Sequence, residues 1–276
     1  MRYFAELSYK GTTFNGWQRQ PNAPSVQQTI EEAFSKTLRV PITIMGCGRT
    51  DTGVHASQFF IHFDLEEKLI EAQKDFPRSL INRLNKLLPP EIAFYKILKV
   101  TEEAHVRFDA ELRAYEYHII FEKNPFLKDS SFCFPFGKQI DFDKMQTAAS
   151  LLLQYDSYFT FCKTKSDTKT MLCDLKRSEW IWKEEGKHMV FHIAANRFLR
   201  GMVRLIVGMC LNVGVGKVSI EEVKYALDKQ ERLKRSYSVP PQGLFLSEVR
   251  YPEEIFSLRY GSVSYTHLTL PTICSV

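Results

Sequence analysis

A short run of glycine and polar residues, Gly46 to His55, constrains this chain more than any other part of its sequence. The run reads GCGRTDTGVH and separates two apolar, strand-like segments, so it predicts a tight polar loop between two strands. Glycine lets the backbone turn sharply and approach a ligand, and Asp51 is the one side chain in the run able to act as nucleophile or base. Beside it, Arg49 is suited to pairing with phosphate. On its own the run fits two interpretations equally: an active site, or a hairpin turn in which the Asp51 side chain bonds its own backbone.

Other glycine-rich motifs do not match this run. It lacks the Lys-Ser or Lys-Thr ending of a phosphate-binding P-loop and the G-x-G-x-x-G spacing of a dinucleotide site, and no helical pattern opens directly after it. We therefore expect no nucleotide cofactor. The six cysteines contain no C-x-x-C pair and no regular spacing, so no zinc framework is expected either.

The composition sets broad limits on fold and location. A chain of 276 residues with 44% hydrophobic content can bury one large core or two moderate ones. Its net charge of +5 assists binding to a polyanion but is common among proteins that bind none. The sequence shows no signal peptide and no apolar run of membrane-spanning length, and free thiols suit a reducing compartment. We therefore expect a cytoplasmic protein without a membrane partner.

Hydrophobic periodicity predicts alternating strands and helices. Strands are expected at Arg2–Tyr9, Ile42–Cys47, Gln58–Asp64, Ile92–Val100, Leu112–Ile120, Cys173–Trp182, His188–Ala194 and Leu244–Arg250. Helices are expected at Ser25–Arg39, at Asp75–Leu88, at Asp143–Leu153, in a basic-faced segment that ends at Gly214, and in a last segment opened by Ser219 and Glu222. This mixture is typical of α+β layers in which helices cover an antiparallel sheet.

Three helix details follow from residue spacing. Ser25 and Gln28 have the spacing of a capping box. The basic-faced segment carries arginines three and four residues apart, so a helix would gather them along one face. They are Arg197, Arg200 and Arg204. The helix at Asp75–Leu88 is expected to turn its apolar residues inward, namely Leu80, Ile81, Leu84, Leu87 and Leu88.

Several separate stretches before and after the polar run also bear on the function. They are Tyr9–Pro21 (YKGTTFNGWQRQP), Ser25–Gln27 (SVQ), Arg107–Ala110 (RFDA), Arg113–Tyr117 (RAYEY), Asn196–Arg204 (NRFLRGMVR) and Gly243–Leu246 (GLFL). With Gly48–Ala56 at their centre, these stretches closely resemble, in this order, the tRNA pseudouridine synthase A family. The resemblance runs from about the first strand to about residue 250.

The resemblance implies a reaction and an architecture. The reaction is isomerisation of uridine to pseudouridine at positions 38, 39 and 40 in the anticodon stem-loop of tRNA, without a cofactor or a metal ion. The architecture is two similar halves whose antiparallel sheets meet at an active-site cleft: residues 1–105 with the Asp51 loop, and residues 106–260 with the active-site tyrosine and arginine. The assembly that the resemblance implies is a homodimer. Residues 261–276 do not resemble the family, and we expect them to be a non-native or disordered tail.

Three residues match the family's catalytic positions. Asp51 corresponds to the catalytic aspartate, whose carboxylate attacks either C1′ of the ribose or C6 of the base, and both routes stay open. Tyr115 corresponds to the tyrosine that packs on the target base and helps to remove the C5 proton. A phenol offers a stacking face and a proton relay, although a half-buried strand shows the same alternating aromatics. Arg204 corresponds to the arginine that pairs with the catalytic carboxylate and favours its ionised form.

Other residues are candidates for binding the RNA around this centre. Arg19, Arg49 and Arg200 are candidates for phosphate. His55 belongs to the substrate-binding loop and is expected to support it rather than to titrate in the reaction. For Arg197 a solvated basic face and contact with RNA are both open.

Two features leave the functional interpretation open in part. Residues Ser157–Phe161 read SYFTF where related enzymes tend to read Asp-Phe-x-Ser-Phe, so a supporting polar contact is expected to change or disappear. The motifs also identify chemistry better than they identify which uridine is delivered. A synthase that acts on another RNA, and a binding-only RNA module without turnover, are therefore the alternative functions.

Overall fold

The structure is a computed structural model that describes residues 1–163 and 170–256. Its strands are β1 (Arg2–Tyr9), β2 (Met45–Gly46), β3 (His55–Asp64), β4 (Ile92–Lys99), β5 (Leu112–Ile120), β6 (Phe132–Cys133), β7 (Leu175–Glu184), β8 (His188–Ala195) and β9 (Leu244–Arg250). Its α-helices are α1 (Val26–Leu38), α2 (Glu67–Glu71), α3 (Arg78–Leu87), α4 (Phe142–Leu151), α5 (Met202–Gly214) and α6 (Ile220–Asp228). The 3-10 helices are Gly11–Thr13, Gly137–Gln139, Leu152–Gln154, Phe159–Phe161, Pro241–Gly243 and Glu253–Phe256.

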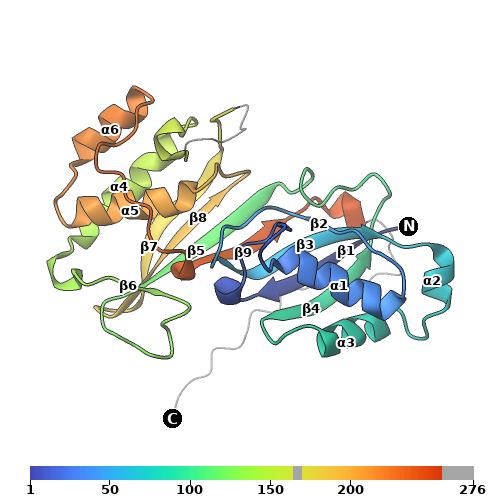
Figure 1. Ribbon diagram of the computed structural model, residues 1–276. Coiled ribbons are helices and arrows are strands. Elements are labelled where there is room, and N and C mark those ends of the chain that lie inside the picture. Colours follow the sequence, from blue (N-terminus) through green and yellow to red (C-terminus); the bar gives the residue numbers. More distant parts are fainter. Residues whose placement is uncertain (164–169, 257–276) are drawn as a thin grey trace, which may run out of the picture.

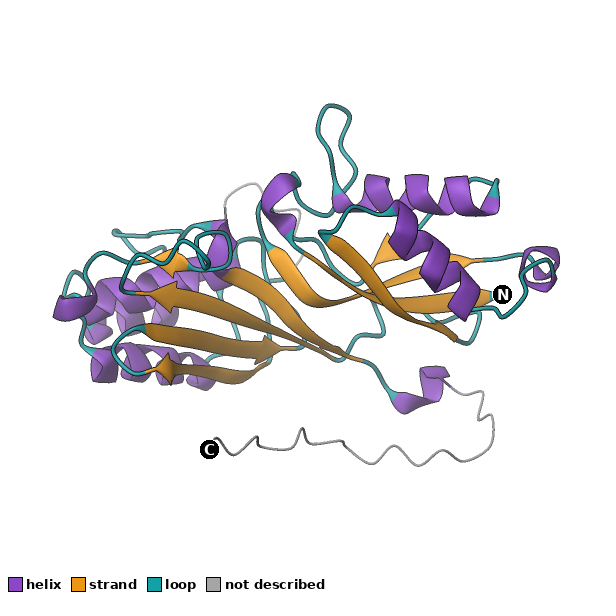
Figure 2. Ribbon diagram, turned by 90° about the horizontal axis from the view of Figure 1, so that it is seen from below, coloured by secondary structure: helices purple, strands orange, loops and turns teal. Residues whose placement is uncertain are grey.

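Within the described residues, the strands make one nine-stranded sheet in the order β4-β1-β3-β9-β5-β8-β7, with β2 paired to β3 and β6 paired to β5 (Figure 1). Most neighbours are antiparallel, but β3 and β9 run parallel, and so do β5 and β6. The last described strand, β9, therefore lies in the middle of the sheet and connects the strands of the first half to those of the second (Figure 1). Figure 2 shows the strands side by side as one continuous sheet. The expected α+β class is confirmed.

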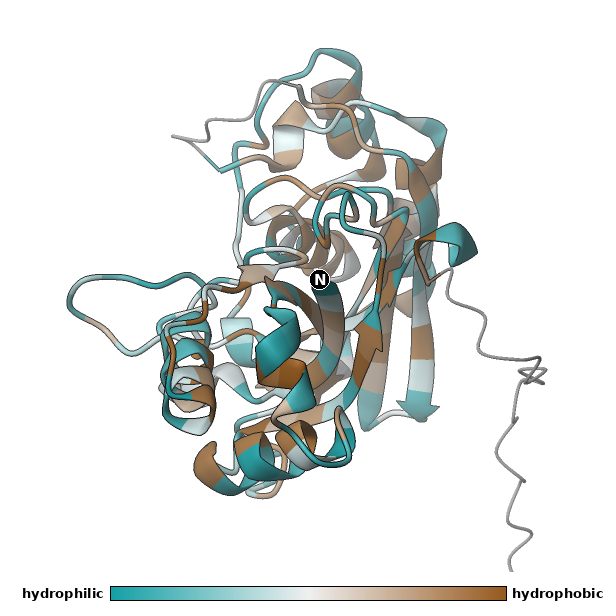
Figure 3. Ribbon diagram, turned by 90° about the vertical axis from the view of Figure 1, so that its right-hand side faces the viewer, coloured by the Kyte–Doolittle hydropathy of each residue, from teal (hydrophilic) through white to brown (hydrophobic). Residues whose placement is uncertain are grey.

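Buried residues gather into two hydrophobic cores, one on each side of β9. The first lies between β1, β3 and β4 and the helices α1 and α3, and the second lies between β5, β7 and β8 and the helices α4, α5 and α6. Strand β9 contributes Leu246 and Val249 to the first core and Leu244 to the second. Hydrophobic segments lie along the strands and the helices beside them, while the outer loops are hydrophilic (Figure 3). Each large side chain buried in this way stabilises the fold by about 1.5–3 kcal/mol.

Most expected elements occur where periodicity places them. In α6 the hydroxyl of Ser219 accepts from the N–H of Glu222, and the Glu222 carboxylate accepts from the N–H of Ser219, which is a complete capping box. The box expected at Ser25 and Gln28 is only half formed. The Ser25 hydroxyl accepts from the N–H of Gln28, but the Gln28 side chain donates to Glu32 one turn further along α1 instead of returning to the cap.

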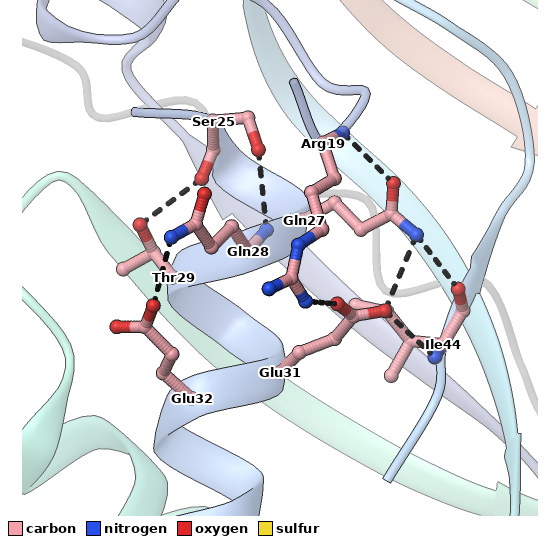
Figure 4. A network of polar contacts seen from close by, with 8 residues as sticks. All are labelled: Arg19, Ser25, Gln27, Gln28, Thr29, Glu31, Glu32 and Ile44. Carbon is pink, nitrogen blue, oxygen red and sulfur yellow. Dashed lines mark hydrogen bonds and ion pairs between the residues drawn. The ribbon is translucent and has the colours of Figure 1, made fainter. Parts of the chain in front are cut away.

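The strand expected at Ile42–Cys47 is wrong in its length, because the observed strand contains only Met45 and Gly46, and Cys47 adds one backbone bond to Phe60 of β3. The reason lies in side chains of α1 (Figure 4). The carbonyl of Ile44 accepts from the Gln27 side chain at 3.2 Å, and the Ile44 N–H donates to Glu31 at 3.3 Å. These contacts satisfy the backbone groups that a longer strand would pair across the sheet.

The basic-faced helix begins later than its sequence spacing predicts. Helix α5 starts at Met202, after Gly201 in the left-handed conformation with φ +71°. Arg200 lies in the turn before the helix, where its carbonyl accepts from the N–H of Lys163. The expectation that Arg197, Arg200 and Arg204 share one helix face is therefore wrong, since only Arg204 belongs to the helix.

Smaller differences and open points complete the comparison. Leu87 is exposed instead of facing the core, and the short helix α2 was not expected from periodicity. No helix in the described parts of the chain is long and apolar enough to cross a membrane. The boundary at residues 105/106 stays a prediction, and the expected tail, residues 261–276, lies outside the described residues.

Candidate active site

The segment between β2 and β3, residues 47–54, is the Asp51 loop. Its backbone is tied to the segment that follows β1: the N–H of Trp17 donates to the carbonyl of Thr50 at 3.2 Å, and the Tyr9 hydroxyl lies 2.8 Å from the Thr50 hydroxyl. The loop turns through a backbone bond from the N–H of Val54 to the carbonyl of Asp51 at 3.1 Å. A backbone turn is therefore present, but the Asp51 carboxylate faces Arg204.

Two glycines outside the loop allow this close approach. A Cβ atom on Gly11 would lie 2.0 Å from the carbonyl oxygen of Val54, and one on Gly16 would lie 2.5 Å from that of Thr50. Gly16 also has φ +86°, a conformation that side chains disfavour. Both residues belong to the Tyr9–Pro21 stretch. Its glycines make room for the backbone of the Asp51 loop.

The buried side chain of His55 anchors the end of the Asp51 loop through both ring nitrogens. The side chain is 1% exposed; Nδ1 accepts from the N–H of Gly11 at 3.0 Å, and Nε2 donates to the carbonyl of Gln242 at 3.1 Å. Burial lowers the pKa of His55, so the imidazole is neutral at physiological pH and keeps this pair of bonds. The structure gives His55 a role in holding the loop.

The Asp51 carboxylate faces Arg204 from the other half of the sheet. The two side chains form an ion pair with Arg204 Nη1 3.5 Å from Asp51 Oδ2. The Arg204 side chain is 14% exposed and that of Asp51 is 37% exposed, so the carboxylate is accessible while the arginine is fixed. Nε of Arg204 donates to the carbonyl of Val239 at 2.7 Å, which sets the direction of the guanidinium. Two residues 153 positions apart in the sequence thus meet as predicted.

Tyr115 stands in the middle of the sheet, on β5 between Leu246 of β9 and Ile193 of β8. Its half-buried ring packs against both hydrophobic cores and meets Phe198 edge to face, with the ring centroids 5.1 Å apart. Burial raises the pKa of the Tyr115 phenol, and the negative charge of Asp51 adds to the shift. The phenol is therefore protonated at neutral pH.

Residues 239–242, here called the strap, precede β9 and hold side chains of the site through their backbone carbonyls. Sequence reasoning missed this role. In order, the carbonyl of Val239 accepts from Arg204, that of Pro240 accepts from the Tyr117 hydroxyl at 2.7 Å, and that of Gln242 accepts from His55. The side chain of Pro241 lies against Gly53, where an added Cβ would be 3.0 Å away. The Pro-Pro pair, Pro240 and Pro241, restricts the backbone because proline fixes φ, and it is the one sequence signal for this role.

Arg113 is a second structural residue that sequence reasoning missed. All five of its N–H donors are engaged by backbone carbonyls, and the bonds run to Cys47 (twice), Ala110, Asn196 and Arg107. Each of these carbonyls lies on a segment that borders the site. The Arg113 side chain therefore holds the start of the Asp51 loop to the segments before β5 and after β8.

The three candidate phosphate ligands differ in whether their side chains are exposed or paired with an acid. Arg49 is exposed on the Asp51 loop, and Arg200 is exposed in the turn before α5. Arg19 instead pairs with Glu31 of α1 at 3.2 Å, while its own N–H donates to the Gln27 side chain (Figure 4). The Arg19 side chain is thus held to α1 in the same network that fixes Ile44.

The segment Ser157–Phe161, which departs from the family pattern, makes polar contacts through Ser157 and Thr160. The Ser157 hydroxyl donates to the Gln230 side chain at 2.6 Å, and the Thr160 hydroxyl donates to the carbonyl of Ala226 at 3.0 Å. Both bonds anchor the segment to the end of α6. The departure from the family pattern therefore leaves this part of the second half held in place.

Residues that could ligate a metal ion do not gather in the described part of the chain. Residues 1–163 and 170–256 contain no group of three or more His, Cys, Asp or Glu side chains placed to hold one. The cysteines at 47, 133, 162, 173 and 210 are free thiols, and Cys274 lies outside the described residues. Burial raises the pKa of the Cys47 thiol, which lies at the start of the Asp51 loop, to about 12.

Gly16→Ala should damage the site more than its backbone strain alone predicts. Gly186 has φ +71° and no atom within 4 Å of an added Cβ, so Gly186→Ala tests the strain without a clash. We expect Gly186→Ala to lower the free energy of unfolding by about 1–2 kcal/mol. Gly16→Ala should lower it further, because the Thr50 carbonyl must move. Urea unfolding of both variants gives the comparison, and equal losses would refute the close packing at Gly16.

Comparison with known proteins agrees with this geometry. A family described as tRNA pseudouridine synthase matches residues 154–252. A protein named tRNA pseudouridine synthase A from Parabacteroides distasonis is 44% identical over 92% of this chain and 98% of its own length. Proteins of the same name from Porphyromonas gingivalis and Bacteroides thetaiotaomicron are each 42% identical, over 92% and 93% of this chain and 99% and 93% of their own lengths. The chain therefore belongs to the tRNA pseudouridine synthase A family.

Proposed function

We propose that this protein isomerises uridine to pseudouridine at positions 38, 39 and 40 in the anticodon stem-loop of tRNA, with Asp51 as the nucleophile. The observation that carries the proposal is the ion pair between Asp51 and Arg204, which come from opposite halves of the sheet. The names of the relatives support tRNA as the substrate. The motif resemblance supports the three positions.

The bonds that change require a nucleophile but neither an oxidant nor a reductant. The N1–C1′ bond breaks, the C5–C1′ bond forms, the proton on C5 leaves, and N1 gains a proton. In our proposal the Asp51 carboxylate attacks either C1′ or C6 and later departs, which lets the base turn and rejoin through C5. The rearrangement is intramolecular and redox-neutral, so carboxylate and phenol groups suffice and no cofactor is proposed.

Tyr115 is proposed to stack on the base and to relay its C5 proton. Because burial raises the pKa of the phenol, Tyr115 is not a phenolate at neutral pH and cannot act as a strong base by itself. It can accept the C5 proton only while it passes its own proton on. Its edge-to-face contact with Phe198 fixes the ring plane, which favours a defined stacking position.

Arg204 is proposed to orient Asp51 and to stabilise its charge. Its Nε bond to the carbonyl of Val239 leaves Nη1 directed at the carboxylate. A fixed cation holds the carboxylate in one direction and requires no reorganisation when the substrate binds. Because Asp51 is more than a third exposed, solvent weakens the pair, and we assign the main effect of Arg204 to orientation.

The active unit is proposed to be a cytoplasmic homodimer. A tRNA is bulky relative to one Asp51 loop, and a second subunit would supply further surface for its body while one site receives the stem-loop. The net charge of +5 per chain favours contact with the RNA backbone on both subunits. The motif resemblance supports the dimer.

Asp51→Asn should abolish pseudouridine formation and leave RNA affinity close to that of the wild type. Asn keeps the local bonds and dihedral preferences of a turn residue but lacks a nucleophilic carboxylate oxygen. Release of tritium from C5-labelled uridine in tRNA measures turnover, and filter binding measures affinity. Substantial release by the purified Asn variant would contradict the nucleophile assignment and favour a purely structural turn.

Arg204→Met should lower turnover by roughly a hundredfold, the loss typical of removing one preorganised polar group. Met keeps an apolar stem of similar length, so the protein should remain folded by circular dichroism. Arg204→Lys is the matched variant, because it restores the charge without the planar fork and should recover part of the rate. A folded Met variant with a wild-type rate would remove Arg204 from the catalytic set.

Light scattering at the concentration used for the assay should give the mass of two chains. Full activity from a protein that scatters as a monomer would show that the dimer is not needed. Measurement at rising salt adds a control, since RNA binding should weaken with salt while an apolar subunit contact should persist.

A further inference from the structure

The side chain of Arg113 bonds backbone segments that carry three other arginines, and it holds these segments next to the start of the Asp51 loop. Its carbonyl partner Cys47 lies two residues before Arg49, its partner Asn196 lies one residue before Arg197, and its third partner is the carbonyl of Arg107 itself. The bonds to Cys47 and Arg107 share one nitrogen, at 2.9 and 2.6 Å. The backbone of Arg107 therefore lies beside the start of the Asp51 loop.

These arginines carry charge that the described protein does not neutralise. Within residues 1–163 and 170–256, neither Arg49 nor Arg107 nor Arg197 forms an ion pair with a carboxylate, and the nearby acid Asp109 accepts from the N–H of His105 instead. Partial burial and the charges of its arginine neighbours lower the pKa of Arg107. Several cations held together without an acid favour an anionic ligand.

An exposed aromatic ring stands directly beside this group. The side chain of Phe108 is 74% exposed, its ring stacks on His105 with centroids 4.2 Å apart, and the Arg107 guanidinium lies 5.9 Å from its centroid. The turn that carries it is tied by the N–H of Arg107 to the His105 ring and by the N–H of Asp109 to the His105 carbonyl. The ring is thus presented in a fixed position, although the fold gains little from exposing it.

We propose that Arg107 and Phe108 form a binding subsite for an unpaired nucleotide of the substrate RNA next to the target uridine. The nucleotide's phosphate would bind Arg107 together with Arg49 and Arg197, and its base would stack on Phe108. The inference rests on the proposed function, because it takes the RNA delivered to Asp51 as the ligand.

The chemistry of the group favours RNA over a protein partner. Guanidinium forks match phosphate oxygens, and every base offers a face to an aromatic ring, so an arginine and a phenylalanine side by side suit a nucleotide. An apolar protein contact would instead bury Phe108 beside several unpaired charges, which is unfavourable. Arg107 is also held next to the start of the Asp51 loop, because one nitrogen of Arg113 donates to the carbonyls of both Cys47 and Arg107.

Two substitutions separate stacking from charge. Phe108→Leu should weaken binding of an anticodon stem-loop RNA by about tenfold or more, with an unchanged salt dependence. Arg107→Gln should weaken binding and reduce the slope of log affinity against log salt by about 0.7 to 0.9, the value of one phosphate contact. The Arg107 carbonyl that Arg113 holds is kept in the Gln variant, so the local fold should persist.

Matched controls lie elsewhere on the surface. Tyr225→Leu removes a ring that is 57% exposed on α6, and Arg83→Gln removes an exposed arginine on α3. Both should bind RNA as the wild type does. A fully paired duplex of the same stem is the second control, because without an unpaired base the Phe108→Leu penalty should vanish while that of Arg107→Gln remains.

The outcomes distinguish this subsite from the proposed function. If the wild type forms pseudouridine but Phe108→Leu and Arg107→Gln bind the stem-loop like the controls, the subsite is refuted and the function stands. If Phe108→Leu changes the mass by light scattering and not the RNA affinity, the ring belongs to a protein contact and the subsite is refuted. If the variants lose affinity as predicted but the wild type makes no pseudouridine, the subsite stands as an RNA surface and the function fails.

Discussion

The insertion of β9 between β3 and β5 is the constraint on which the rest of the structure depends. Only His55 and Ala56 of β3 pair directly with β9, so a short parallel ladder carries the junction between the two cores. Beyond it the side chain of Gln58 accepts from the N–H of Val249 at 2.8 Å, which replaces a ladder bond with a side-chain bond. The backbone ladder between the two halves is thus short, and the Asp51 loop lies immediately before it in the chain.

This junction explains why the ion pair between Asp51 and Arg204 spans the two halves. Residues 239–242 lead into β9, and their carbonyls hold Arg204 from the second half and His55 from the first. A shift of β9 would therefore move Arg204 and, through His55, the end of the Asp51 loop. The site is kept by backbone acceptors under it, while the carboxylate of Asp51 remains free to react.

The sequence predicted the polar loop, the strands that flank it and the meeting of Asp51 with Arg204, because glycine spacing and motif order are local or inherited signals. It could not predict the short β2, since the Gln27 and Glu31 side chains that satisfy Ile44 act from a helix. It also placed Arg197 on a helix, because spacing of three and four residues does not reveal that Gly201 adopts a left-handed turn. Long-range side-chain to backbone bonds leave no periodic trace in a sequence.

Arginine shows most clearly why residue type alone does not fix a role. Every N–H donor of the Arg113 side chain bonds a backbone carbonyl, so Arg113 is structural even though it lies beside the site. Arg204 divides its donors between the Val239 carbonyl and Asp51, which suits a residue that is held rigidly and still meets the Asp51 carboxylate. Arg49 and Arg107 form no ion pair with a carboxylate in the described part of the chain, so their charge is available to the anion proposed above. Since the same side chain becomes a brace, an orienting partner or an anion ligand according to the acceptors around it, only the positions of those acceptors in the fold assign the roles.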